Sequence, residues 1–132
     1  MQSTITKIST AIAYATLASP NLDAAERFYR DTLGFDVERM GTVPDNLMVH
    51  CGKGTGLSVY ERPTAPNCDA TAATFIVEDI DSAMSDLRGH GVVFEEYDLP
   101  YLKTVSGVAV QGPTKACWFK DPAGNILSLV QM

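Results

Sequence analysis

The chain repeats one pattern of elements, and this repeat limits the fold more than any other feature of the sequence. Residues 15–17 (Ala-Thr-Leu) are matched by residues 73–75 (Ala-Thr-Phe) at an offset of 58 positions. Residues 22–25 (Leu-Asp-Ala-Ala) are matched by residues 80–83 (Ile-Asp-Ser-Ala) at the same offset. A fixed offset between similar segments indicates two copies of one structural unit. The sequence therefore predicts a fold built from two related modules.

Each copy of the repeat predicts a strand, a helix and three further strands. Asn21 is a suitable N-cap for the first helix, whose apolar residues recur at helical spacing and which ends before Gly34. The second helix is expected over residues 79–90 and ends before Gly91. Short apolar runs between Gly, Pro and Asn predict the strands. We expect these strands at residues 11–19, 35–40, 46–51, 56–61, 72–77, 92–97, 115–119 and 126–130.

The two modules are expected to share one hydrophobic core. Neither module alone can bury both a helix face and a four-stranded sheet, and 132 residues is the size of one domain. We therefore predict a single α+β domain at residues 1–132, built from βαβββ modules at about residues 8–62 and 70–132. A chance similarity between two α+β stretches is the alternative.

Charge and cysteine content exclude several classes of partner. The net charge of −6 and the isoelectric point of about 4.7 disfavour binding to nucleic acid or to an anionic membrane. Three cysteines form no CxxC pair, and the N-terminal residues do not resemble a signal peptide. Reduced thiols in the cytoplasm are therefore expected, rather than a disulfide framework.

Two segments carry a resemblance to a known family. ATLASPNLDAAERFYRDTLGF and WFKDPAGNILSLVQ resemble the vicinal oxygen chelate (VOC) superfamily, which contains glyoxalase I, extradiol dioxygenases, fosfomycin-modifying enzymes and bleomycin-resistance proteins. The resemblance covers about residues 11–131. It implies two βαβββ modules that form an open, curled mixed β-sheet barrel with helices on the outside, holding a ligand and a divalent metal on the concave face. It also implies a homodimer with clefts near the interface.

The resemblance also implies where a metal would be held. In the family's metalloenzymes, His, Gln or Glu from the first and last strands of each module bind the ion. Those places fall here on Tyr14, Ser58, Ala72 and Ser128. Alanine cannot coordinate a metal, and neutral hydroxyls are poor ligands for first-row divalent ions. We therefore expect no metal cofactor; a shifted site that includes His50 is the open alternative.

The concave face is predicted to bind an organic molecule. Strand alternation places small residues, hydroxyls and two phenols there, which suits a neutral or cationic ligand held by stacking and hydrogen bonds. The long connection over residues 97–115 is expected to form a lid or a subunit-interface loop. For the aromatic residues, plain core packing is the alternative. The predicted ligand-binding residues are Tyr14, Ser58, Tyr60, Thr74, Tyr101, Lys103, Trp118 and Ser128.

Three functions agree with this sequence. The first, which we expect, is a metal-independent small-molecule-binding protein of the resistance or sequestration type, similar to bleomycin-resistance proteins. The second is an enzyme with a displaced or absent metal site. It would be either a metal-free lyase or isomerase that uses Tyr14 or Tyr60 as an acid, or a glyoxalase-like or dioxygenase-like metalloenzyme with displaced ligands. The third is a structural or regulatory domain with a vestigial cleft. No catalytic residue is predicted, because no general base is assured at the centre of the cleft.

Overall fold

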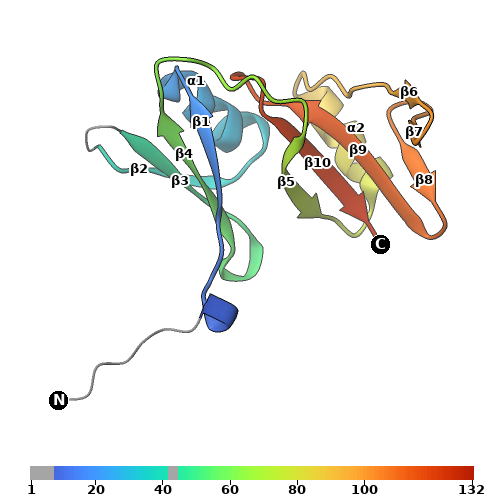
Figure 1. Ribbon diagram of the computed structural model, residues 1–132, viewed down its shortest axis with the longest axis horizontal. Coiled ribbons are helices and arrows are strands. Elements are labelled where there is room, and N and C mark those ends of the chain that lie inside the picture. The colour runs from blue at the N-terminus through green and yellow to red at the C-terminus, as the bar shows by residue number, and fades with distance from the viewer. Residues whose placement is uncertain (1–7, 42–44) are drawn as a thin grey trace.

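The structure, a computed structural model, describes residues 8–41 and 45–132 of the chain. Module one and module two lie side by side, each with a four-stranded sheet and a helix (Figure 1). Module one contains β1 (Ala15–Ser19), α1 (Leu22–Arg27), the π-helical turn η2 (Phe28–Thr32), β2 (Asp36–Arg39), β3 (Asn46–His50), the short turn η3 (Gly52–Gly54) and β4 (Gly56–Glu61), preceded by η1 (Ile8–Thr10). Module two contains β5 (Thr71–Ile76), α2 (Ile80–Gly89), the hairpin of β6 (Asp98–Leu99) and β7 (Leu102–Lys103), β8 (Ala109–Gln111), β9 (Thr114–Lys120) and β10 (Ile126–Gln131).

The two sheets have the same topology. Their strand orders are β1-β4-β3-β2 and β5-β10-β9-β8, and in each the first strand pairs parallel with the last while the other pairs are antiparallel. The sheets remain open and do not close into a barrel. The predicted α+β fold of two repeated modules with open, curled mixed sheets is confirmed.

The repeat in the sequence is also a repeat in local hydrogen bonding. The Asn21 side chain caps α1 by accepting from the Ala24 N–H, at 3.0 Å. Asp79 caps α2 by accepting from the Ser82 N–H, at 3.2 Å. Both caps satisfy a backbone donor that has no partner inside its helix. Two helices therefore begin in the same way at matching positions, and each crosses from the first strand of its module back to the sheet.

The predicted strand at residues 92–97 is wrong. In this segment Phe94 forms only an isolated bridge with Phe119, and the fourth strand of module two is β8, which lies within the predicted 97–115 connection. Val92 and Phe94 are buried, so their alternation serves core packing rather than a ladder of hydrogen bonds. The first strand is also shorter than predicted, since β1 begins at Ala15.

One hydrophobic core joins the two modules. It is formed by the helix-facing sides of both sheets together with α1 and α2. Phe28 of η2 lies 6.4 Å from Phe119 of β9, measured between ring centroids, and Phe35 lies 5.2 Å from Phe75 of β5. Within the described ranges, no helix is long and apolar enough to cross a bilayer.

A buried polar cluster also links the modules. The Tyr29 hydroxyl of η2 donates to Oδ2 of Asp121 at 2.7 Å. Asn125 Nδ2 donates to the same oxygen and to the Ala18 carbonyl of β1, both at 2.9 Å. Oδ1 of Asp121 accepts from the backbone N–H groups of Ala123 and Asn125, each at 2.9 Å. The segments FYRDTLGF and DPAGN therefore meet at one inter-module contact.

Candidate functional site

The first group of predicted site residues lies on one side of the module-one sheet. One side of this sheet packs against α1. We call the opposite side, which carries the predicted residues, open face A and define it by Tyr14, Thr16, Ala18, Ser58 and Tyr60. Thr16 is aligned with Ser58 across the parallel β1–β4 pair, and Ala18 with Tyr60. The Tyr14 ring lies over Gly56. Its Cε1 atom would be only 3.7 Å from a Cβ atom added at Gly56. Open face A therefore presents phenols and hydroxyls, with Tyr14 45% exposed.

The second group lies on the equivalent side of the module-two sheet. We call this side open face B, defined by Ala72, Thr74, Ile76, Trp118 and Ser128. Thr74, Ser128 and Trp118 form one row across β5, β10 and β9. Thr74 and Ala72 are exposed, whereas Ser128 is only 2% exposed. Open face B thus differs from open face A in having an indole and a buried hydroxyl.

Trp118 is the neighbour of Ser128 on β9, and its side chain reaches toward β5. Its indole Nε1 donates to Thr71 Oγ1 at 3.2 Å, although Trp118 is on β9 and Thr71 is on β5. The indole therefore extends across β10, the strand that carries Ser128. The Tyr97 ring packs edge-on against it, with centroids 5.5 Å apart. The Ser128 hydroxyl donates weakly to the Leu129 carbonyl at 3.4 Å, so its proton is directed at its own backbone.

Tyr101 and Lys103 lie apart from the other predicted residues. Both belong to the β6–β7 hairpin, at the end of the molecule away from module one (Figure 1). Lys103 Nζ is 3.9 Å from Asp98 Oδ1, and both side chains are exposed. The base of the hairpin is fixed to Tyr97, whose N–H donates to Thr104 Oγ1 at 2.8 Å. The hairpin therefore adjoins the Tyr97–Trp118 pair and open face B.

The structure brings six of the eight predicted ligand-binding residues together in two groups, one on each open face, and leaves Tyr101 and Lys103 on the hairpin. Because the helix-facing sides of both sheets share the core, open faces A and B point away from it. Thr71 and Tyr97, which position Trp118, were not predicted. No local signal identifies them, because their contacts depend on which strands become neighbours.

The four places that the resemblance implies for metal ligands hold Tyr14, Ser58, Ala72 and Ser128. Among the described residues, no group of three or more His, Cys, Asp or Glu is arranged to hold a metal ion. His50 is on β3, where its Nε2 lies 3.4 Å from Glu38 Oε1, and both side chains are largely exposed. This pair offers only two side chains that could bind a metal ion.

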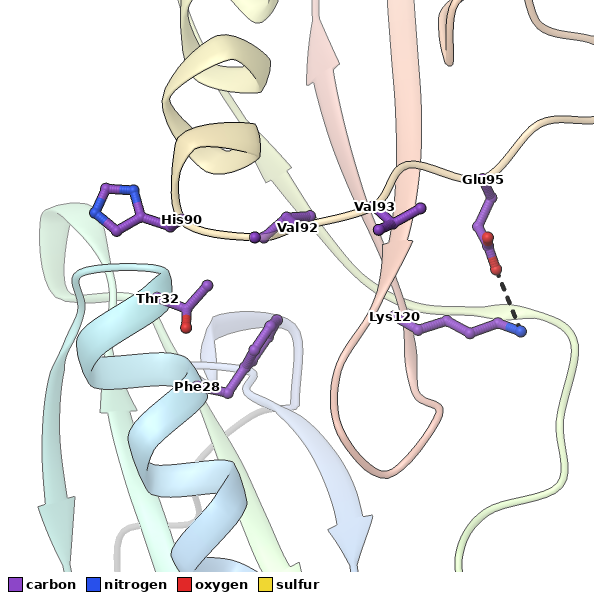
Figure 2. Close-up of a pocket in the computed structure, with 8 residues that line it drawn as sticks. Phe28, Thr32, His90, Val92, Val93, Glu95 and Lys120 are labelled. Carbon is purple, nitrogen blue, oxygen red and sulfur yellow. Dashed lines mark ion pairs between the residues drawn. The ribbon is translucent and has the colours of Figure 1, made fainter.

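The described residues also form two hollows, and the larger one borders open face B at Thr74 and Ile76. Figure 2 shows the smaller one, of about 400 Å³, where the C-terminal ends of η2 and α2 approach each other. The Glu95 carboxylate and the Lys120 ammonium form an ion pair at its edge, 3.2 Å apart. The larger one, of about 950 Å³, lies between the modules and has apolar walls contributed by β1, β4, β5 and α2. We call it the inter-module groove. Of the predicted residues, Thr74 alone borders it.

The fold and these faces define a protein of the glyoxalase and bleomycin-resistance class. The sequence profile of the Glyoxalase/Bleomycin resistance protein/Dioxygenase superfamily matches residues 11–129. The chain belongs to this superfamily. No curated protein sequence matches it.

Solved structures of similar fold include proteins with different functions. The antibiotic binding protein TnmS3 from Streptomyces sp. CB03234 is 23% identical, with 92% of this chain and 97% of that one covered and a TM-score of 0.63. A glyoxalase family protein from Enterococcus faecalis is 21% identical over 92% of this chain and 97% of that one, with a TM-score of 0.69. The fosfomycin resistance protein FosX from Listeria monocytogenes is 14% identical over 93% of each chain, with a TM-score of 0.68. At these identities the similarity shows the fold.

Proposed function

We propose that the protein binds an aromatic small molecule on its open faces and releases it chemically unchanged. The observation that carries this proposal is the aromatic platform of open face B, where Tyr97 supports the half-buried indole of Trp118 beside the exposed Thr74 hydroxyl. A flat ring stacks on an indole, and a neighbouring hydroxyl fixes its orientation. Tyr14 and Tyr60 on open face A supply two further rings.

We further propose that binding requires no metal. The residues at the four family places do not fit a divalent ion, because Ala72 has only a methyl group and Tyr14 and Ser58 offer neutral hydroxyls. Ser128 supports this most strongly, since it is buried and its hydroxyl donates to the neighbouring Leu129 carbonyl. The His50–Glu38 pair supplies fewer donors than the three protein ligands of a catalytic zinc site.

A second copy of the chain is proposed to complete the cleft. Each open face is one wall, and the two walls of one chain point away from their shared core. Tyr14, which directly precedes the edge strand β1, is 45% exposed, and Ile76 of the edge strand β5 is 62% exposed. Large exposed side chains beside sheet edges favour a partner surface. In a homodimer, face A of one copy opposite face B of the other would enclose the ligand between phenols and indole.

The names of two structural neighbours agree with a role in resistance. TnmS3 is an antibiotic binding protein and FosX is a fosfomycin resistance protein. We propose sequestration of an antibiotic or a related metabolite as the role of this chain, in the cytoplasm, where its three free thiols would stay reduced. The acidic net charge of −6 favours a neutral or cationic ligand over an anionic one.

A thermal-shift screen tests the proposal. Aromatic antibiotics are added in the presence of EDTA, and each compound is then recovered and analysed by chromatography. A ligand at a hundred times its dissociation constant should stabilise the fold by about 2.7 kcal/mol. Thr74→Val should weaken binding of any hit, whereas Thr55→Val, away from the open faces, should not. Conversion of the compound would favour the glyoxalase-like or dioxygenase-like alternative, and no response to a broad panel would favour a vestigial cleft.

A further inference from the structure

The Glu96 carboxylate gathers hydrogen bonds from the connection that follows it. Its Oε1 accepts from the Thr104 hydroxyl at 2.8 Å and from the Gly107 N–H at 2.5 Å. Both donors lie within the 97–115 connection, which the sequence predicted as a lid or a subunit-interface loop. A hydrogen bond to a carboxylate is shorter and stronger than one to a neutral acceptor. Glu96 therefore draws two separate points of this connection to one oxygen.

The Thr104 hydroxyl transmits this hold to Tyr97. Its proton can point to Glu96 Oε1 at 2.8 Å or to the Tyr97 carbonyl at 3.4 Å, and the nearer, charged acceptor is favoured. A lone pair of the hydroxyl oxygen then accepts from the Tyr97 N–H at 2.8 Å. The Thr104 N–H donates to the Tyr97 carbonyl at 2.9 Å. One residue thus bonds both backbone groups of Tyr97, and the Glu96 carboxylate sets the direction of its hydroxyl.

Tyr97 in turn supports Trp118. The Glu95 N–H donates to the Trp118 carbonyl at 2.8 Å, so the backbone that leads into Tyr97 runs beside β9. The Tyr97 ring meets the indole edge-on, with 82° between the ring planes, an arrangement that aromatic pairs prefer. The single donor of the indole, Nε1, bonds Thr71 Oγ1 at 3.2 Å. Because the indole is only half-buried, we expect its orientation to depend on these two contacts.

The turn that bonds to Glu96 is itself anchored to α2. Gly107 is buried, and a Cβ atom added there would lie 3.1 Å from Phe94 Cβ. Arg88 of α2 donates to the Ser106 carbonyl at 3.1 Å, and its guanidinium lies 5.1 Å from the centre of the Phe94 ring. Glu96 therefore bonds to a turn that is held against the helix and the core.

We propose that Glu96 is a positioning residue for the aromatic platform of open face B. Acting through Thr104, its carboxylate holds Tyr97 in the orientation that supports Trp118, and residues 97–108 form a fixed support rather than a lid. The effect on ligand binding rests on the proposed function, because the platform is where an aromatic ligand is proposed to stack. The arrangement of the side chains does not, so it is tested without a ligand.

Near-UV circular dichroism tests the arrangement, because Trp118 is the only tryptophan of the chain. Glu96→Ala and Thr104→Val should lose the fine structure of the indole bands, since the indole loses the fixed ring beside it. Thr104→Ser keeps the hydroxyl and should keep the wild-type spectrum. Glu95→Ala is the matched control and should also keep it, because that carboxylate pairs with Lys120 instead. Glu96→Ala and Thr104→Val remove opposite ends of one bond, so either carries the test if the other fails to fold.

Amide hydrogen exchange tests the fixed support. In the wild type the N–H groups of Tyr97, Thr104 and Gly107 should exchange slowly. Glu96→Ala should speed their exchange at least about tenfold, which corresponds to the loss of a hydrogen bond to a charged group. Unprotected amides at these positions in the wild type would describe a lid and overturn the inference. A wild-type dichroism spectrum in Glu96→Ala or Thr104→Val also overturns it, as does a Thr104→Ser spectrum that matches Thr104→Val, since the hydroxyl would then not be responsible.

A binding measurement separates this inference from the proposed function. The probe is proflavine, a flat aromatic cation, titrated by calorimetry in EDTA. Its dissociation constant should rise about fivefold in Glu96→Ala and Thr104→Val, because an edge-on aromatic contact contributes modestly, and should stay unchanged in Thr104→Ser and Glu95→Ala. Absence of proflavine binding to the wild type, with the expected dichroism and exchange, counts against the proposed function and leaves the positioning role supported. Unchanged affinity together with an unchanged indole spectrum overturns the positioning role.

Discussion

The buried bond between Tyr29 and Asp121 should be a main link between the modules, and Tyr29→Phe tests it. The change removes one hydroxyl from a side chain that is fully buried and leaves the ring in place. Asp121 keeps its three other bonds, two from backbone N–H groups and one from Asn125 Nδ2. A hydrogen bond to a charged group contributes about 1.5–3 kcal/mol, so we expect a loss of about 2 kcal/mol in the free energy of unfolding.

Urea denaturation measures this loss. With a slope of about 1–3 kcal/mol per M, a loss of about 2 kcal/mol lowers the midpoint by about 1 M. Tyr14→Phe is the control, because Tyr14 is on the open surface, and it should change stability by less than about 0.5 kcal/mol. Combined with Asp121→Asn in a double-mutant cycle, Tyr29→Phe should show a coupling of at least about 1 kcal/mol. The reasoning is refuted if Tyr29→Phe is as harmless as Tyr14→Phe.

Three further predictions concern other parts of the structure. Gly56→Ala should lower stability by about 1–3 kcal/mol in urea denaturation, because its Cβ would lie 2.6 Å from the Val49 carbonyl oxygen; an unchanged midpoint would contradict this close approach. Arg39 bonds hold the pKa of Asp45 below its usual 3.8, so this stabilisation is present above pH 3.8 and is lost as pH falls through the lower folded pKa. Melting temperatures should therefore show Arg39→Gln destabilised at pH 7 and nearly equal to wild type near pH 2. Burial raises the pKa of Cys117 to about 11, so this thiol should react with a thiol reagent only in denaturant, and prompt labelling of the native protein would be the wrong result.

The sequence predicted the modules because their signals are local. The helix cap at Asn21 depends on residues close together in the chain, and the repeat is found by comparing short segments that each keep their own order. The strand at residues 92–97 failed because apolar alternation reports burial, and a buried Phe94 needs no ladder of hydrogen bonds. β8 was missed because its three residues, Ala-Val-Gln, carry a weak pattern.

The candidate site was predicted less completely than the fold. Alternation assigned Thr74 and Ser128 to one face, and the register places them in one row. Alternation could not indicate that Trp118 reaches across β10 to Thr71. That contact joins residues 47 positions apart, and it depends on β5, β10 and β9 being neighbours in one sheet. The inter-module groove could not be predicted for the same reason, because its walls come from both halves of the chain.

The most direct test of a metal-independent binding protein uses its only tryptophan, Trp118, which lies on open face B. Fluorescence is recorded while an aromatic ligand from the thermal-shift screen is titrated into protein in EDTA, and again with added Zn²⁺ or Mn²⁺. The account predicts a saturable change in emission with the same dissociation constant in both conditions and full recovery of the unaltered ligand. Binding that needs the divalent ion, or a ligand that returns chemically changed, would contradict it.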